Sequence, residues 1–106
     1  MAAFNISPEI TKIAEDFAKL VKNQLKLDRV YLYGSYAKGF SMKDSDIDIA
    51  VVAEDFSGDL VEDTLKLMKI RRYIDTRIEP HPFTKEDFNE QNPYVKEIID
   101  TGIRIV

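Results

Sequence analysis

Two aspartates two residues apart, Asp46 and Asp48, are the residues of this sequence best placed to do chemistry. They stand at the start of an apolar run, where a strand's period of two puts both carboxylates on one face. Carboxylates this close repel each other unless a cation lies between them. Hard oxygen ligands, completed by phosphate oxygens, are the usual surroundings of Mg2+. The pair therefore predicts a site for one or two Mg2+ ions.

A second feature lies upstream, where Gly34-Ser35 interrupts the strand predicted over 30–33. Glycine at this point lets the backbone approach a ligand closely. The amides of a short helical turn that follows, together with the Ser35 hydroxyl, are suited to bind a phosphate. Lys38 adds positive charge near the same phosphates. Gly34, Ser35 and Lys38 are therefore the predicted nucleotide-binding residues.

The two features occur in a fixed order: strand, Gly34-Ser35, ten residues, then Asp46-Ile47-Asp48. This pattern resembles the signature of the DNA polymerase beta nucleotidyltransferase superfamily, and the short chain resembles its minimal nucleotidyltransferase (MNT) branch. The resemblance implies an α/β (α+β) nucleotidyltransferase fold, a small mixed sheet of three to four strands flanked by helices. It also implies that Asp46 and Asp48 are catalytic metal ligands, and that ATP is the donor of AMP. Superfamily members often carry Arg where Lys38 stands, and Lys keeps the charge but loses the bidentate fork.

The family pattern also implies a third carboxylate, for which Asp75 and Glu79 are the candidates. Alternation over 73–79 predicts a third strand that carries both acids on one face, with Pro80 and Pro82 ending it. If strands two and three are parallel, Asp48 and Asp75 both lie near a strand start. Glu79 would then lie about 13 Å further along, at about 3.3 Å per residue. Asp75 is therefore the predicted third catalytic and metal-binding residue, with an ion pair to Arg77 or Arg72 as the alternative.

Periodicity and turn residues predict the remaining elements. Apolar residues at helical spacing indicate two long helices. In the second helix we expect these residues to face the core: Leu60, Val61, Thr64, Leu65, Leu67, Met68 and Ile70. Thr84 with Asp87 is typical of a capping box that opens a short helix. Asn92-Pro93 opens the last helix and Gly102 closes it, and 103–106 forms an edge strand or coil. The predicted helices cover 8–25, 59–71 and 93–101, and the predicted strands cover 30–33, 46–53 and 73–79.

Two further side chains near the site have structural interpretations. Tyr33 shares a strand face with Ser35, and packing against the sheet is favoured over lining a base pocket. His81, the single histidine, lies between two prolines, and a surface or core-edge position is favoured over catalysis.

Length and composition limit the remaining choices. With 106 residues and 44% hydrophobic content, residues 1–106 are expected to form one domain. The chain has no cysteine, which excludes disulfides and thiolate zinc sites. We find no signal peptide or membrane span, so a cytoplasmic protein without a membrane partner is expected. A net charge of -4 argues against a broad nucleic-acid surface.

The resemblance implies a magnesium-dependent nucleotidyltransferase that acts on a nucleoside triphosphate. MNT proteins often act as antitoxins that bind a helical HEPN-domain toxin and adenylylate one of its tyrosines, so we expect a HEPN partner and an activity that depends on it. A non-catalytic antitoxin that neutralises its partner by binding, and a stand-alone transferase for a small molecule or RNA end, are the alternatives. Apolar helix faces are compatible with packing inside the chain or in a homo-oligomer.

Overall fold

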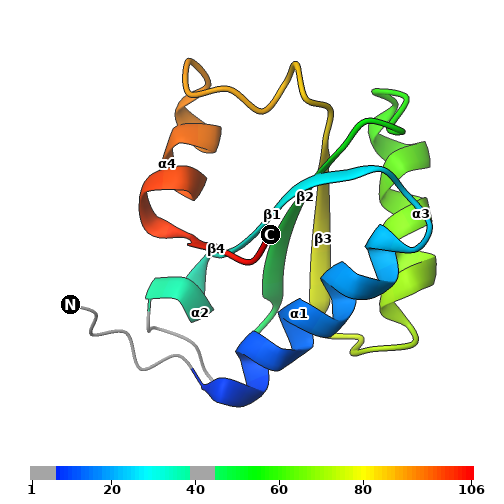
Figure 1. Ribbon diagram of the computed structural model, residues 1–106. Coiled ribbons are helices and arrows are strands. Elements are labelled where there is room, and N and C mark those ends of the chain that lie inside the picture. Colours follow the sequence, from blue (N-terminus) through cyan, green and yellow to red (C-terminus); the bar gives the residue numbers. More distant parts are fainter. Residues whose placement is uncertain (1–6, 39–44) are drawn as a thin grey trace.

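The computed structural model describes residues 7–38 and 45–106, and this part of the chain forms helices on both faces of a mixed sheet (Figure 1). The sheet has the strand order β3-β2-β1-β4. β1 is antiparallel to both β2 and β4, whereas β2 and β3 are parallel. The expected small mixed sheet is thus confirmed. The helices are α1 (Pro8–Lys22), α2 (Ser35–Lys38), α3 (Leu60–Arg71) and α4 (Pro93–Thr101), and the strands are β1 (Leu27–Tyr33), β2 (Ile47–Ala53), β3 (Ile78–Phe83) and β4 (Ile103–Arg104).

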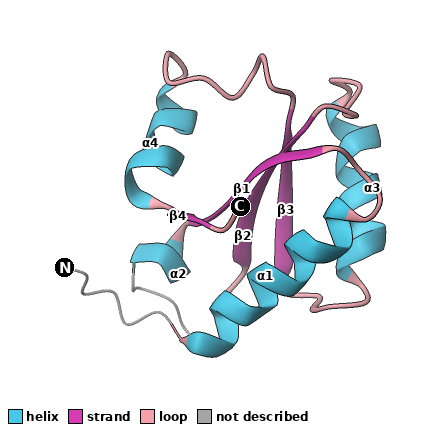
Figure 2. Cartoon of the chain, viewed as in Figure 1, coloured by secondary structure: helices cyan, strands magenta, loops and turns pink. Residues whose placement is uncertain are grey.

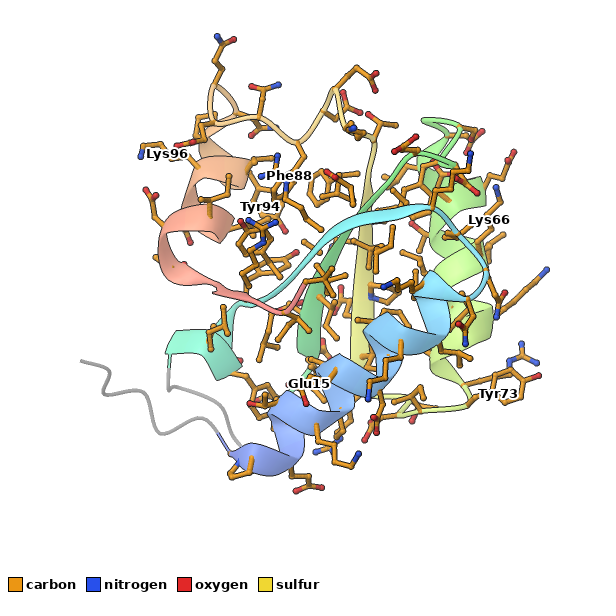
Figure 3. All side chains as sticks on the ribbon, in the orientation of Figure 1. Glu15, Lys66, Tyr73, Phe88, Tyr94 and Lys96 are labelled. Atoms are coloured by element: carbon orange, nitrogen blue, oxygen red, sulfur yellow. The ribbon has the colours of Figure 1, made fainter. Side chains whose placement is uncertain are left out.

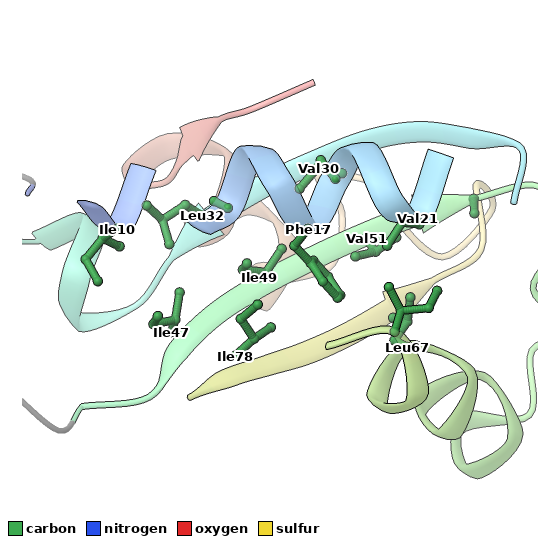
Figure 4. Close-up of a cluster of buried hydrophobic side chains, with 14 of the residues drawn as sticks. Ile10, Phe17, Val21, Val30, Leu32, Ile47, Ile49, Val51, Leu67 and Ile78 are labelled. Carbon is green, nitrogen blue, oxygen red and sulfur yellow. The ribbon is translucent and has the colours of Figure 1, made fainter. Parts of the chain in front are cut away.

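Each face of the sheet has its own apolar cluster, because side chains alternate between the faces along a strand. On one face α1 and α3 bury Phe17, Val21 and Leu67 against the β1 and β2 residues that point towards them (Figure 4). On the other face α4 and the segment before it cover the sheet, as the helices in Figure 2 show. This second cluster consists of Tyr31, Tyr33, Ala50, Val52, Phe88, Val95 and Ile98.

The third strand lies further along the chain than the sequence predicted. The prediction of 73–79 was wrong, since β3 covers Ile78–Phe83 and includes Pro80 and Pro82. β3 is an edge strand, and backbone N–H directions alternate along a strand. Prolines two residues apart therefore leave their missing donors on one side, where β3 has no neighbour, and the pairing with β2 is kept. The parallel direction of β2 and β3 was predicted correctly.

Helix α3 buries fewer apolar residues than its sequence suggested. Leu67 and Ile70 are buried, but Leu60, Val61 and Leu65 are exposed at 68%, 69% and 51%. The expectation that these three residues face the core was wrong. The buried side chains of α3 instead include Asp63, which accepts hydrogen bonds from the backbone N–H groups of residues 57 and 58 and from the Ser57 hydroxyl. Asp63 thereby fixes the loop between β2 and α3.

The C-terminal elements follow the prediction closely. The Asn92 side chain accepts from the Tyr94 N–H at the start of α4, and Gly102 follows its end. The residues after it form β4, beside β1. The predicted short helix after Thr84 is a turn instead, closed by the Asp87 N–H to the Thr84 hydroxyl at 3.1 Å. No helix in residues 7–38 or 45–106 has the length and apolar character needed to cross a membrane.

Two leucines on α3 test this account of packing. Leu67 is fully buried, so Leu67→Ala should lower the free energy of unfolding by about 2–5 kcal/mol. Leu65→Ala removes the same atoms from an exposed position and should change it by less than about 0.5 kcal/mol. Urea denaturation measures both. Equal losses would show that the outer face of α3 is buried in solution.

Candidate active site

Three strands place Tyr33, Asp48 and Glu79 in one row across the sheet. Tyr33 of β1 pairs with Asp48 of β2, and Asp48 pairs with Glu79 of β3. Paired residues of neighbouring strands point to the same face. This is the face that α4 covers further along, and here the two carboxylates remain accessible, with Glu79 exposed and the side chain of Asp48 26% exposed. The row therefore places two acids side by side at the start of two parallel strands.

A third acid joins them from the segment before β2. The side chains of Asp46 and Glu79 are in contact, and this contact, followed by burial and by the charge of Asp48, raises the pKa of Glu79 above its ordinary value. Asp46, Asp48 and Glu79 thus form a group of acids in which the neighbours of Glu79 make its ionisation less favourable.

The Gly34 turn lies directly against this group. Gly34 has a φ of 78°, a left-handed conformation that glycine adopts without strain. A β-carbon at this position would collide with the Oδ2 atom of Asp48 and lie 3.1 Å from its Cγ. Glycine is therefore required both for the turn and for its approach to the carboxylate. The structure thus brings Gly34 and Asp48 together.

His81 joins the same site from β3, two residues beyond Glu79. Its Nε2 lies 3.2 Å from Oδ1 of Asp48, and its side chain is 28% exposed. The ring packs against Tyr33 with centroids 5.4 Å apart. Ala50, paired with His81 across the strands, carries only a methyl group and leaves room for this contact. His81 therefore lies within the edge strand, not after its end as the sequence suggested, and it contacts a site carboxylate.

An aromatic cluster separates the site from the rest of the α4 face. The Tyr33 and Tyr94 hydroxyls are hydrogen-bonded at 2.6 Å, and burial and then this bond raise the pKa of Tyr33. Beside this pair, the Phe83 ring packs edge-on against Phe88 and lies tilted against Tyr94. Figure 3 shows Phe88 and Tyr94 between α4 and the sheet, whereas Lys96 points away. The packed position predicted for Tyr33 is confirmed.

Asp75 lies outside this group. It comes three residues before β3, and its carboxylate accepts from the Arg77 N–H at 2.8 Å and from Nη2 of Arg77 at 2.9 Å. These bonds lower the pKa of Asp75. The argument that placed Asp75 beside Asp48 was wrong because it started the strand five residues too early. The alternative, an ion pair with Arg77, is what the structure contains.

Sequence reasoning weighed Glu79 and rejected it in favour of Asp75, and it missed His81 as a neighbour of Asp48. The signal was an acid and a histidine in alternation with prolines, the pattern of an edge strand whose open side needs no N–H donors. Of the predicted nucleotide-binding residues, the side chain of Lys38 lies outside the described part of the chain.

Comparison with known proteins identifies related sequences. Residues 15–106 match the family described as "Polymerase beta, Nucleotidyltransferase". A Methanocaldococcus jannaschii protein named "Putative protein adenylyltransferase MJ1379" is 30% identical over 96 residues, which cover 90% of this chain and 92% of that protein. A second protein of the same organism, "Putative protein adenylyltransferase MJ0141", is 30% identical over 92% of this chain and 99% of its own length.

Solved structures share the fold. A crystal structure of a "putative nucleotidyltransferase from Sulfolobus solfataricus" superposes with a TM-score of 0.64 over 90% of this chain and 78% of that one, at 23% identity. A "toxin-antitoxin with AMP-PNP" superposes with a TM-score of 0.60 at 25% identity, over 87% of this chain and 72% of that one. These likenesses agree with the mixed sheet and its flanking helices.

The ion pair between Asp75 and Arg77 predicts a contribution to stability that depends on pH. Asp75→Asn should lower the free energy of unfolding by about 1 kcal/mol at neutral pH, because Arg77 loses an ionised partner. A lowered pKa contributes stability that is lost as the pH falls through it, so the difference from wild type should shrink in acid. Thermal unfolding across pH measures this. Asp16→Asn, which breaks the exposed Lys12 pair, is the control and should cost less; equal costs would contradict the assignment.

The close approach of Gly34 to Asp48 predicts a second effect on stability. Gly34→Ala should cost about 1–3 kcal/mol from backbone strain and more from the collision with Asp48. Gly58→Ala is the matched control, since Gly58 also has a positive φ but no atoms within 4 Å of the added carbon. Adding Asp48→Ala should relieve part of the Gly34→Ala loss and none of the Gly58→Ala loss. Urea titrations of the double variants decide this.

Proposed function

This chain belongs to the polymerase beta nucleotidyltransferase family and is a nucleotidyltransferase, and we propose that it transfers AMP from ATP to a hydroxyl group of a partner protein. The observation that carries the proposal is the gathering of Asp46, Asp48 and Glu79 against the Gly34 turn. The names of its relatives support a protein as the acceptor. The AMP-PNP in a structurally similar toxin-antitoxin supports an adenine nucleotide as the donor.

We propose that Asp46, Asp48 and Glu79, with Glu79 in the place first given to Asp75, hold Mg2+. The raised pKa of Glu79 supports this choice, because it reflects contact with Asp46, then burial and then the charge of Asp48, and a divalent cation would compensate these clustered acids. The oxygen donors suit Mg2+. When bound, the ion would neutralise the phosphates and polarise the phosphorus under attack.

The Gly34-Ser35 turn is the proposed support for the β and γ phosphates. Gly34 has no side chain between its backbone and the carboxylate of Asp48, so a triphosphate at the turn would lie close to the acids. The Ser35 hydroxyl would donate a hydrogen bond to a phosphate oxygen. Lys38 keeps its predicted role as a source of positive charge near these phosphates.

The proposed reaction breaks one bond and forms one. The acceptor hydroxyl oxygen bonds to the α phosphorus, the bond from that phosphorus to the bridging oxygen breaks, and pyrophosphate leaves on the Gly34-Ser35 side. The hydroxyl proton passes to Glu79, which is exposed at the start of β3 and so is accessible to the acceptor. Asp46 and Asp48 hold the reacting groups in place.

The acceptor that we propose is a tyrosine of a HEPN-domain toxin, with this chain as its antitoxin. The proposal rests on the resemblance to the MNT branch, and the toxin-antitoxin assemblies among the structural relatives support it. In such a pair, binding would deliver the tyrosine to the carboxylates.

The donor is tested by thermal unfolding with Mg2+ and each of the four nucleoside triphosphates. Ligand at about 100 times its dissociation constant adds about 2.7 kcal/mol, which is several degrees for a domain of this size. ATP should give the largest shift. The shift should disappear in the double variant Asp46→Asn, Asp48→Asn, compared with the same protein without ligand, since removal of repelling charges can itself stabilise the fold.

Substitution of Glu79, in β3, and of Asp75, before it, should have different effects on the transferase activity. Wild-type protein is added with α-labelled ATP and Mg2+ to an extract of the source organism. Proteins of the extract should then gain bound label. Glu79→Gln should reduce that labelling by at least about a hundredfold, because it removes a metal ligand and the proton acceptor. Asp75→Asn should change labelling by less than about threefold, since Asp75 is bonded to Arg77. The reverse ranking would restore Asp75 as the third carboxylate.

The fate of the label tests the acceptor. Label that protease releases as AMP-tyrosine supports the proposal. Label that ribonuclease removes, or that stays in small molecules, would contradict it and favour a stand-alone transferase. Wild-type protein that binds ATP and labels nothing would contradict catalysis.

A further inference from the structure

His81 contributes a nitrogen atom to a cluster of oxygen donors. The ligand atoms of Asp48, Glu79 and His81 all lie within 4.8 Å of one another. The Nε2 of His81 and Oδ1 of Asp48 are 3.2 Å apart. In the described residues this is the group of acids and histidines that is tight enough to hold a metal ion.

These separations agree with the ligand shell of a small dication. For metal–ligand distances of about 2.1 Å in an octahedron, adjacent ligands are about 3.0 Å apart and opposite ones about 4.2 Å. The Asp48–His81 distance is close to the first value. The ligand atoms lie within 4.8 Å of one another, which slightly exceeds the distance between opposite ligands. A change of rotamer at the exposed Glu79 would remove this excess. One ion can therefore contact all three side chains.

The neighbours of His81 hold it in this position. Pro80 and Pro82 fix the backbone φ on either side of it. The Tyr33 ring packs on the imidazole at 5.4 Å, and the hydrogen bond of Tyr33 to Tyr94 fixes that ring in turn. His81 thus loses little conformational freedom when it binds an ion, and a prearranged ligand binds more tightly.

Resting on the proposed function, we propose that His81 is a metal ligand that makes this site prefer a first-row transition-metal dication to Mg2+. Imidazole suits Co2+, Zn2+ and Fe2+, whereas sites for Mg2+ are built from oxygen. Asp48 and Glu79 bind either class, so the single nitrogen sets the preference. His81 is a specificity-determining residue of the site.

The experiment measures binding of Co2+ and of Mg2+ to tag-free protein without nucleotide, by calorimetry, above the ordinary imidazole pKa of about 6.5. Wild type should prefer Co2+. His81→Gln should reduce Co2+ affinity by at least about tenfold, because even outer-shell partners contribute about 10- to 100-fold. It should change Mg2+ affinity by less than about threefold. Asp75→Asn, which removes a carboxylate that is bonded to Arg77 outside the site, should bind both ions as wild type does.

Nuclear magnetic resonance gives a second readout that needs no His81 variant. His81 is the single histidine of the sequence, so its imidazole nitrogen signals are identified without assignment. Zn2+ should shift the Nε2 signal of wild type and Mg2+ should not, and Asp48→Asn should weaken the Zn2+ effect. An imidazole that does not respond to Zn2+, or an equal ratio of Co2+ to Mg2+ affinity in wild type and His81→Gln, would overturn the proposal.

The two proposals fail separately. Suppose that the protein transfers AMP with Mg2+ but its His81 Nε2 signal does not shift with Zn2+. This result would leave the proposed function intact and contradict the role of His81. A Zn2+-dependent imidazole shift in a protein that transfers no AMP would support the metal preference and remove the proposed reaction.

Discussion

The pairing of Asp48 with Glu79 across β2 and β3 is the constraint on which the site depends. It places two negative charges on neighbouring strands, and Asp46 adds a third, so the fold holds an arrangement that electrostatics opposes. Such an arrangement persists because the strands are fixed elsewhere: Ile47, Ile49 and Ile78 are fully buried on the opposite face. The apolar core under the sheet thus keeps the carboxylates together.

The two faces of the sheet have different roles: one forms the main apolar core, and the other carries the site and an aromatic cluster. The face under α1 and α3 is apolar along its whole length. The other face changes character along the strands, from carboxylates and an imidazole at one end to packed aromatic rings under α4. Tyr33 belongs to both parts, since it contacts His81 and is bonded to Tyr94. A change in the position of α4 would therefore be transmitted to the site through one ring.

The sequence was most informative where each signal spans a few residues and several such signals follow one another in a fixed order. Asp46, Asp48 and Gly34-Ser35 could be placed because turn glycines and strand alternation act over a few residues, and the family order of these elements is specific. The third strand could not be placed, because Pro80 and Pro82 end a central strand but are tolerated on an edge, and edge position depends on the whole sheet. Glu79 was rejected in favour of Asp75, and His81 was not placed beside Asp48, for that reason. The exposure of Leu60 and Leu65 was missed because period alone does not show how much of a helix its neighbours cover.

The prolines of β3 also limit how this chain can assemble with others. An open strand edge offers a row of backbone donors and acceptors to a strand from another molecule, but Pro80 and Pro82 remove the donors from this one. At the other side of the sheet, β4 has two residues and offers little edge. In the described part of the chain, sheet extension between molecules is therefore disfavoured on both sides. Side chains rather than backbone are therefore the groups that this chain offers to a partner, and the exposed apolar ones on α3 include Leu60, Val61 and Leu65.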